Sequence, residues 1–228
     1  MKYLLNASID TLPTKTNLKR WGKRTNDLCY CGKRQTLNHI LNCCNKSLTN
    51  GKYLWRHNNV LHHIKKCIDV KEFTLYIDLD ENRQSRKSTI PPNAVVTTLI
   101  PDIVLIDEKT KSLEIFELTC PAETRIDIAH LLKVEKYAHL VNDIKEYKTE
   151  VNVFEIGSHT GQITKRNKEC LSKLHTYCHK FIKNQTFIKN ISAITMLGSY
   201  HVFNSRDEED WVECSPILAP FKYTNQKQ

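Results

Sequence analysis

The chain has 228 residues, a length that suits one domain with a small appendage. Its formal net charge of +9 favours a polyanionic partner such as nucleic acid over an acidic or neutral one. It has nine cysteines, an odd number, no signal-peptide pattern and no apolar run long enough to span a bilayer. These features predict a reducing compartment and exclude a membrane partner.

Residues 1–26 are predicted to form a basic linker. Five cations lie between Lys15 and Arg24, and Trp21 stands among them. Basic residues around an aromatic ring can grip a phosphate backbone while the ring stacks on a base. A solvated loop anchored by Trp21 explains the pattern equally well. The candidate nucleic-acid contacts of this linker are Lys19, Arg20, Trp21 and Arg24.

Residues 27–68 are predicted to form a small metal-binding knuckle and a following helix. Cysteines and a histidine gather between residues 29 and 44, and Gly32 permits a tight turn after the first cysteine pair. Thiolates and imidazole suit a tetrahedral Zn²⁺, and such a loop needs the metal to become ordered. Reduced cysteines with a surface histidine are the other interpretation. The predicted zinc ligands are Cys29, Cys31, His39 and Cys44, with Cys43 as the alternative to Cys44.

The helix of this region is predicted over residues 51–67, because apolar residues recur on one face. The residues predicted to face inward are Leu54, Val60, Leu61 and Ile64. Arg56 and His57 lie in the same helix, and their side chains could meet a phosphate. A charged, solvated helix face is an equally good interpretation of this pair.

Residues 69–185 are predicted to form an α/β core, followed by a C-terminal helix and tail over residues 186–228. Strands are expected over residues 71–79, 98–106, 112–120 and 151–156. Helices are expected from about Glu123, over residues 164–183 with Thr164 as the N-cap, and over residues 187–200. The loop between residues 82 and 93 is expected to contact DNA through Arg83, Arg86 and Lys87.

Carboxylates interrupt two of these apolar strands. Asp102 directly follows Pro101, and Glu117 is flanked by apolar residues. A carboxylate in an apolar strand needs a partner or a metal, and two on adjacent strands can share one divalent cation. The alternative, without catalysis, is that Asp102 is a turn residue and that Glu117 pairs with a lysine facing the core. Glu155, in the strand over residues 151–156, is a further carboxylate expected to act only in support.

The helix after the second carboxylate is predicted to turn a lysine toward the pair. At about 100° per residue, one apolar arc is defined by Leu131, Val134, Ala138 and Val141, and extended by Tyr137, Leu140 and Ile144. Lys133 falls inside this arc and Lys136 at its edge, so Lys136 is the alternative. Two carboxylates that hold Mg²⁺ or Mn²⁺ and a lysine that offsets developing charge are what a phosphodiester hydrolase needs.

The ordered set resembles the PD-(D/E)XK restriction-like nuclease superfamily: Pro101-Asp102, then Glu117 in FELTCP, then Lys133 in KVEKY. It is similar in particular to the endonuclease at the C-terminus of site-targeting non-LTR (LINE-type) retrotransposon polyproteins. There the lysine is moved from the second strand onto the following helix, and Thr119 occupies the usual lysine position here. The family also carries a Cys-Cys-His-Cys knuckle before the nuclease, usually with a C-x-x-C first pair where this chain has C-x-C.

The resemblance implies a restriction-endonuclease-like core with a mixed central sheet flanked by helices. It implies a nuclear enzyme that nicks target DNA so that the freed 3′ end primes reverse transcription. The implied partners are DNA, element RNA and the reverse transcriptase portion of the same polyprotein. The alternatives are a catalytically inactive zinc-containing nucleic-acid-binding module and a zinc-stabilised interaction domain, which the charge of +9 disfavours.

Overall fold

The structure is a computed structural model, and it describes residues 2–79 and 88–223. Its α-helices are α1 (Lys2–Ser8), α2 (Lys15–Arg20), α3 (Asn45–Thr49), α4 (Lys52–Cys67), α5 (Ile126–Asp143), α6 (Lys165–His175) and α7 (Asn184–Asn204). Its strands are β1 (Thr74–Ile77), β2 (Ile103–Asp107), β3 (Ser112–Thr119) and β4 (Lys148–Glu155). A π-helix spans His39–Cys43, and a 3₁₀-helix, Glu123–Arg125, leads into α5.

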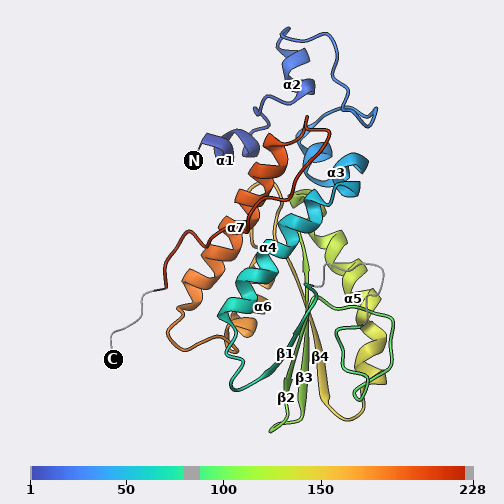
Figure 1. Cartoon of the computed structure of the whole chain (residues 1–228), viewed down its shortest axis with the longest axis vertical. Coiled ribbons are helices and arrows are strands. Elements are labelled where there is room, and N and C mark those ends of the chain that lie inside the picture. Colours follow the sequence, from blue (N-terminus) through green and yellow to red (C-terminus); the bar gives the residue numbers. More distant parts are fainter. Residues whose placement is uncertain (1, 80–87, 224–228) are drawn as a thin grey trace.

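The strands form one mixed sheet in the order β1-β2-β3-β4. The first three form an antiparallel meander, and β4 pairs parallel to β3 after the crossover through α5. Helices lie on both sides: Figure 1 shows α5 on one side of the sheet and α4, α6 and α7 on the other. The prediction of a mixed α/β fold with a central sheet flanked by helices is therefore confirmed.

Several strand ends differ from the prediction. β2 begins at Ile103 rather than at residue 98, because Pro101 has no N–H to donate to a neighbouring strand. β1 is shorter than predicted, and β4 begins earlier, at Lys148. Thr164 caps α6 as predicted, since its hydroxyl accepts from the N–H of Asn167 at 3.3 Å. This helix ends at His175, before the predicted end at residue 183.

Side-chain alternation divides the sheet residues between two cores. Ile103, Leu105 and Phe116 pack with the buried faces of α4, α6 and α7. Val104 and Ile115 point the other way and pack with α5. Because successive residues of a strand face opposite sides, Asp102 and Glu117 share the α5 side with Val104 and Ile115.

The buried face of α5 is narrower than predicted. Tyr137 and Leu140 are fully buried, Lys133 contacts β3 and His130 contacts the edge strand β4. Residues on the side of α5 beyond His130 project past the edge of the sheet, because β4 is the last strand there in the described part of the chain. The predicted arc is therefore wrong for the four residues that defined it, all of which are exposed: Leu131, Val134, Ala138 and Val141.

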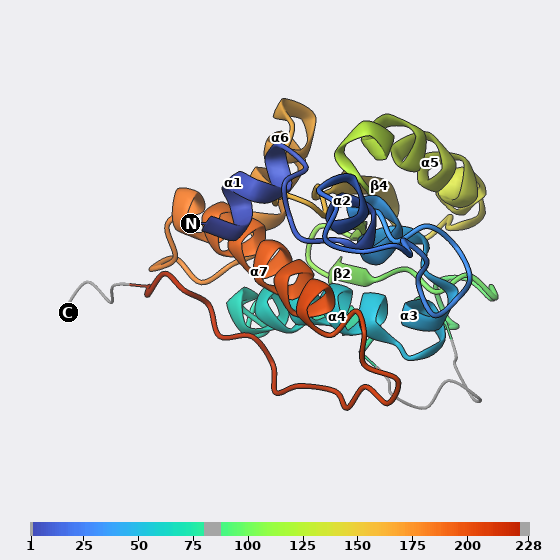
Figure 2. The same ribbon diagram turned by 90° about the horizontal axis from the view of Figure 1, so that it is seen from above.

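The parts predicted as separate regions share cores. Val60, Leu61 and Ile64 of α4 are fully buried in the same core as Phe187 and Ile191 of α7 and the central strands. The predicted boundaries at residues 68 and 185 therefore fall inside one packed unit. A smaller cluster joins α1 and the knuckle to the end of α7. Figure 2 shows α1 crossing beside α7.

Two other predictions concern the loop and the membrane. Arg83, Arg86 and Lys87, expected to contact DNA, lie outside the described residues. Among the described residues, no helix combines the length and the apolar character needed to cross a bilayer.

Candidate metal centre and candidate active site

The candidate metal ligands come from a turn and the π-helix that follows it. In the turn, the N–H of Gly32 donates to the carbonyl oxygen of Cys29 at 2.9 Å, and Gly32 has a φ of +82°, which glycine adopts without strain. His39 opens the π-helix and Cys44 follows its last residue. Hydrogen bonds in a π-helix join residues five apart. The single turn of the π-helix therefore brings the side chains of His39 and Cys44 to one side.

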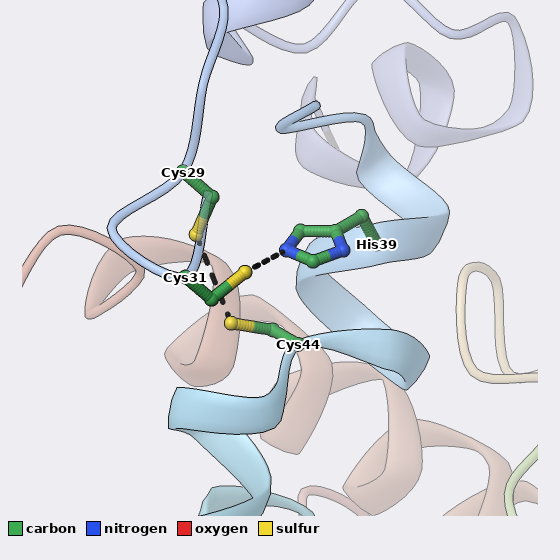
Figure 3. Close-up of side chains that lie close together, drawn as sticks. All are labelled: Cys29, Cys31, His39 and Cys44. Carbon is green, nitrogen blue, oxygen red and sulfur yellow. Dashed lines mark hydrogen bonds between the residues drawn. The ribbon is translucent and has the colours of Figure 1, made fainter. Parts of the chain in front are cut away.

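The four predicted ligands converge (Figure 3). The sulfur of Cys29 lies 3.7 Å from that of Cys44, and the sulfur of Cys31 lies 3.1 Å from Nε2 of His39. All four ligand atoms lie within 4.8 Å of one another. Tetrahedral bonds of about 2.0–2.3 Å separate ligand atoms by about 3.3–3.8 Å. The cluster could therefore hold a metal ion, as predicted.

Burial sets the pKa shifts of two members of this cluster, Cys29 and His39. It raises the pKa of Cys29 to about 11 and lowers the pKa of His39 below its ordinary value. Both shifts favour neutral side chains, because a buried charge without a partner is unfavourable. At Cys44, by contrast, burial is outweighed by hydrogen bonds to Ser47 and to neighbouring thiols, which lower the pKa. A bound cation would reverse the preference of Cys29, since it stabilises thiolates, and it would take the imidazole in its neutral form.

A tyrosine that the sequence analysis did not identify supports the cluster. The hydroxyl of Tyr53 accepts from the N–H of Cys44 at 3.0 Å and donates to the carbonyl of Ile40 at 2.8 Å. It therefore fixes both ends of the π-helix. Cys43, the predicted alternative ligand, is exposed and lies outside the cluster.

The register of the sheet brings the two candidate catalytic carboxylates together. Ile103 of β2 pairs with Phe116 of β3, so the next position outward sets Asp102 opposite Glu117. The carboxylate of Glu117 accepts from the N–H of Asp102 at 3.1 Å and forms an ion pair with the ammonium of Lys133. The three residues predicted from the sequence therefore meet in one place.

A fourth side chain joins this site from α4. Nε2 of His57 lies 3.2 Å from Oδ2 of Asp102, and the same oxygen accepts from the N–H of Leu118 at 2.7 Å. His57 was predicted as a phosphate contact, and the structure places it against a carboxylate. We call Asp102, Glu117, Lys133 and His57 the carboxylate site.

The two carboxyl groups have opposite pKa shifts. Burial and the adjacent Asp102 raise the pKa of Glu117, against the opposing effect of Lys133. Burial acts in the same sense on Asp102, but His57 and the N–H of Leu118 outweigh it and hold the pKa of Asp102 below its ordinary range. Although burial disfavours the imidazolium, Asp102 raises the pKa of His57 to about 9. Asp102 is thus anionic at neutral pH and His57 cationic.

Lys136, the alternative catalytic lysine, has different contacts. Its ammonium donates to the hydroxyl of Tyr137 at 2.9 Å, and that hydroxyl donates to the carbonyl of Ile100 at 3.2 Å. Lys133 therefore pairs with a candidate metal ligand, whereas Lys136 rests on a tyrosine beside it.

The carboxylate site lies in a cleft of about 790 Å³. The knuckle provides part of one wall, through Asn38, Asn42 and Cys43, and α5 provides another, through Ile128 and Leu132. A groove of larger volume, about 1370 Å³, lies along β1 and is lined by none of the candidate catalytic residues. The cleft, although smaller, is therefore the space in which a substrate would meet the carboxylates.

Arg56, predicted as a phosphate contact, lines the cleft, but its guanidinium is already engaged by groups of the protein. Its side chain is buried and donates to the carbonyls of Leu41 and Cys120 and to the hydroxyl of Ser199, each at 3.1 Å. It thereby connects the knuckle, the end of β3 and α7. A Cβ on Gly198 would lie 2.8 Å from Cγ of Arg56, so the close approach of α7 to this arginine depends on glycine.

The candidate DNA contacts of the linker lie apart from the cleft. Trp21 is 43% exposed at the end of α2, and Arg20 and Arg24 are exposed beside it. The ammonium of Lys19 lies 3.1 Å from Oδ1 of Asp27, so this lysine already has an anionic partner. None of the four predicted contacts of the linker lines the cleft.

Glu155 forms a separate buried cluster on the same side of the sheet. Its carboxylate lies 3.0 Å from Nδ1 of His130 and 3.5 Å from a guanidinium nitrogen of Arg166. It does not line the cleft. The carboxylate is thus paired with His130 of α5 and Arg166 of α6, which suits a structural role.

The chain matches no protein-family model and no curated protein. Its chemistry must therefore be inferred from its own residues. Two neighbouring carboxylates that line a cleft, with an ammonium and an imidazole beside them, supply oxygen ligands for a hard cation and positive charge for an anionic substrate.

Proposed function

We propose that the chain is a metal-dependent DNA endonuclease of the restriction-like class, and that the carboxylate site performs the hydrolysis. The observation that carries the proposal is the pairing of Asp102 with Glu117 across adjacent strands, with Lys133 bound to Glu117, inside the cleft. A four-stranded mixed sheet with a parallel β4 reached through α5 supports the assignment to this class.

Asp102 and Glu117 would hold Mg²⁺ or Mn²⁺, since both offer hard oxygen ligands. The bound cation would polarise the phosphate and lower the pKa of a water. Lys133 would then release Glu117 to the cation and offset negative charge on the phosphate as it develops. His57 holds the carboxylate of Asp102 in position, and Leu118 fixes the same oxygen through its N–H.

The knuckle would bind zinc rather than Mg²⁺. Three sulfurs and one imidazole nitrogen are soft and borderline ligands, which select Zn²⁺ over hard cations. By resemblance, the endonuclease would nick the target site of a non-LTR retrotransposon in the nucleus. The nick would prime reverse transcription by the polymerase portion of the same polyprotein.

The test is plasmid nicking with Mg²⁺ or Mn²⁺ by the wild type and by Asp102→Asn. We expect the variant to lose nicking by about 10²-fold or more, because a ligand of the essential cation is gone. Glu155→Gln is the matched control, since it changes a buried strand carboxylate outside the cleft, and it should keep wild-type activity once its folding is verified.

A gel shift measured in parallel separates the rival function. A wild type that shifts DNA but nicks none with either cation would be an inactive nucleic-acid-binding module. Nicking by Asp102→Asn at the wild-type rate would show that the reaction occurs elsewhere on the chain.

A further inference from the structure

The chain turns back after α7 and lies along the outside of the helical layer. Residues 211–223, which we call the strap, have no regular secondary structure. Figure 2 shows this dark red segment running back beside α4 and α7. What holds it must therefore be sought in side chains of the two helices, because no strand or helix of its own stabilises it.

One face of α4 contacts the strap at regular intervals. Trp55, Asn59 and His63 are four residues apart, so they form a row along the helix. The indole N–H of Trp55 donates to the carbonyl of Cys214 at 2.9 Å, and Oδ1 of Asn59 accepts from the N–H of Ile217 at 2.6 Å. Two of the three residues of this row thus bind main-chain atoms of the strap.

The third residue of the row binds a side chain. Nε2 of His63 lies 2.8 Å from the hydroxyl of Tyr223, and the sulfur of Cys67 lies 3.2 Å from the same hydroxyl. The rings of His63 and Tyr223 stack with centroids 5.9 Å apart. Tyr223 therefore fixes the register of the strap at its far end.

An asparagine of α7 binds the strap from the other side. Nδ2 of Asn190 donates to the carbonyl of Phe221 at 3.0 Å, and Oδ1 of Asn190 accepts from the N–H of the same residue at 2.9 Å. Asn190 is fully buried. An amide that satisfies both main-chain groups of one residue recognises an extended peptide whatever its side chain is.

Adjacent side chains of the strap have different environments. Ile217 and Ala219 pack against the core formed by α4, α7 and the sheet. Leu218, between them, is 79% exposed, and Val212 is 81% exposed. The groove therefore selects apolar side chains at alternate positions, as a site for an extended peptide does.

We propose that the groove between α4 and α7 is a peptide-binding site, and that a second copy of this chain can donate its strap to it. The contacts to Cys214, Ile217 and Phe221 are to main-chain atoms, so they form whichever copy supplies the segment. The fit of Ile217 and Tyr223 selects this sequence over others. Exchange of an identical element joins two copies without any new contact surface. The activity of the carboxylate site is not needed for it.

The first test uses a fluorescent peptide of residues 211–223 and the full chain. In the wild type, the attached strap already occupies the groove and competes with an added peptide. A strap that fills the groove in about 90% of the molecules would weaken binding of the added peptide about tenfold. Ile217→Asp weakens the attached strap and leaves the groove intact. We expect this variant to bind the peptide about tenfold or more tightly than the wild type does. Leu218→Asp, at the exposed neighbour, should bind as the wild type does.

The groove itself is tested by adding Asn190→Ala to Ile217→Asp, which should abolish peptide binding because Phe221 loses both hydrogen bonds. Circular dichroism verifies that each variant is folded. The proposal is overturned if folded Ile217→Asp binds the peptide no better than Leu218→Asp, or if binding survives the loss of Asn190.

A second measurement remains informative if Ile217→Asp does not fold. The wild type and Leu218→Asp are refolded at low and high protein concentration, and their masses are measured by light scattering. We expect both proteins to form dimers, and the fraction of dimer to increase with protein concentration. An excess of the peptide of residues 211–223, added during refolding, should convert these dimers to monomers. Monomers at every concentration, or dimers that resist the peptide, would refute exchange of the strap.

Discussion

The metal cluster and the carboxylate site are built in opposite ways. The four ligands of the cluster lie close together in the sequence, between residues 29 and 44, on a turn and a π-helix, and the π-helix packs in a small core with α1 and α7. The members of the carboxylate site come from the residue before β2, from β3 and from two helices, all anchored in large cores. The first site should therefore depend on its ligand for order, whereas the second is ordered before any ligand arrives.

The largest effect should come from losing the metal at the knuckle. Cys44→Ser removes a ligand that no neighbour can replace, and we expect the free energy of unfolding to fall by at least about 3 kcal/mol. Cys43→Ser, at the exposed neighbour, should change it by less than about 0.5 kcal/mol. Urea unfolding with a zinc assay on both variants measures the difference. A chelator should lower the stability of Cys43→Ser and leave Cys44→Ser unchanged.

Equal losses in the two cysteine variants would mean that the choice between Cys43 and Cys44 is wrong. Zinc retained at one per chain by Cys44→Ser would mean that the knuckle closes with another ligand.

The carboxylate site should lose chemistry rather than order. Lys133→Met removes the ammonium beside Glu117, and we expect nicking to fall about 10²-fold, since one charged group is lost from the developing transition state. Lys136→Met, whose ammonium rests on Tyr137, should nick within about threefold of the wild type. Initial nicking rates at saturating Mg²⁺ measure both. A larger loss in Lys136→Met than in Lys133→Met would reverse the assignment.

The sequence predicted the two sites through different signals. The ligand spacing from Cys29 to Cys44 is local, so it could be read directly from the chain. Asp102 and Glu117 could be placed together because a short charged turn joins their strands and sets a hairpin register. The carboxylates interrupt apolar runs, and such an interruption is visible in the sequence itself.

What the sequence could not give depends on tertiary packing. The apolar residues Leu131 and Val134 have the spacing of a buried face, but they are exposed because β4 ends the sheet. Arg56 is a charged residue of the kind that usually lies at the surface, but it is buried because Gly198 lets α7 approach it. The partner of His57 could not be predicted either, because Asp102 is distant in sequence and meets it only through the packing of α4 on the sheet.

The connection between the two sites can be weakened at Gly198. In an ordinary helix interior, Gly→Ala stabilises by about 0.5–1 kcal/mol. Here we expect Gly198→Ala to destabilise by about 1–3 kcal/mol, because the new methyl group would overlap Cγ of Arg56. Urea unfolding gives the sign directly. Stabilisation by this substitution would mean that Arg56 moves aside freely and does not connect the knuckle to β3.

The smallest effect should appear where the knuckle meets the end of α7. Oδ1 of Asp207 lies 3.0 Å from the ammonium of Lys15 and accepts from the side-chain amide of Gln35 at 2.9 Å. Although partial burial opposes it, these contacts hold the pKa of Asp207 below its ordinary value. A depressed carboxyl pKa stabilises the fold above the ordinary pKa of about 3.9, and the contribution is lost as pH falls through the lower folded-state value.

Asp207→Asn should therefore lower the free energy of unfolding by about 0.5 kcal/mol at pH 7, a small value because the pair is partly exposed. The difference from the wild type should fade as pH falls from the ordinary carboxyl pKa through the lower folded-state value, where the wild-type carboxylate becomes protonated. Asp210→Asn, at an exposed carboxylate three residues later, is the control and should be neutral at every pH. Urea unfolding over a pH series from 7 to well below the ordinary carboxyl pKa measures all three proteins. A loss that does not shrink anywhere in this series would show that the shape of Asp207, rather than its charge, joins the knuckle to α7, and that the two regions are coupled more tightly than their separate cores suggest.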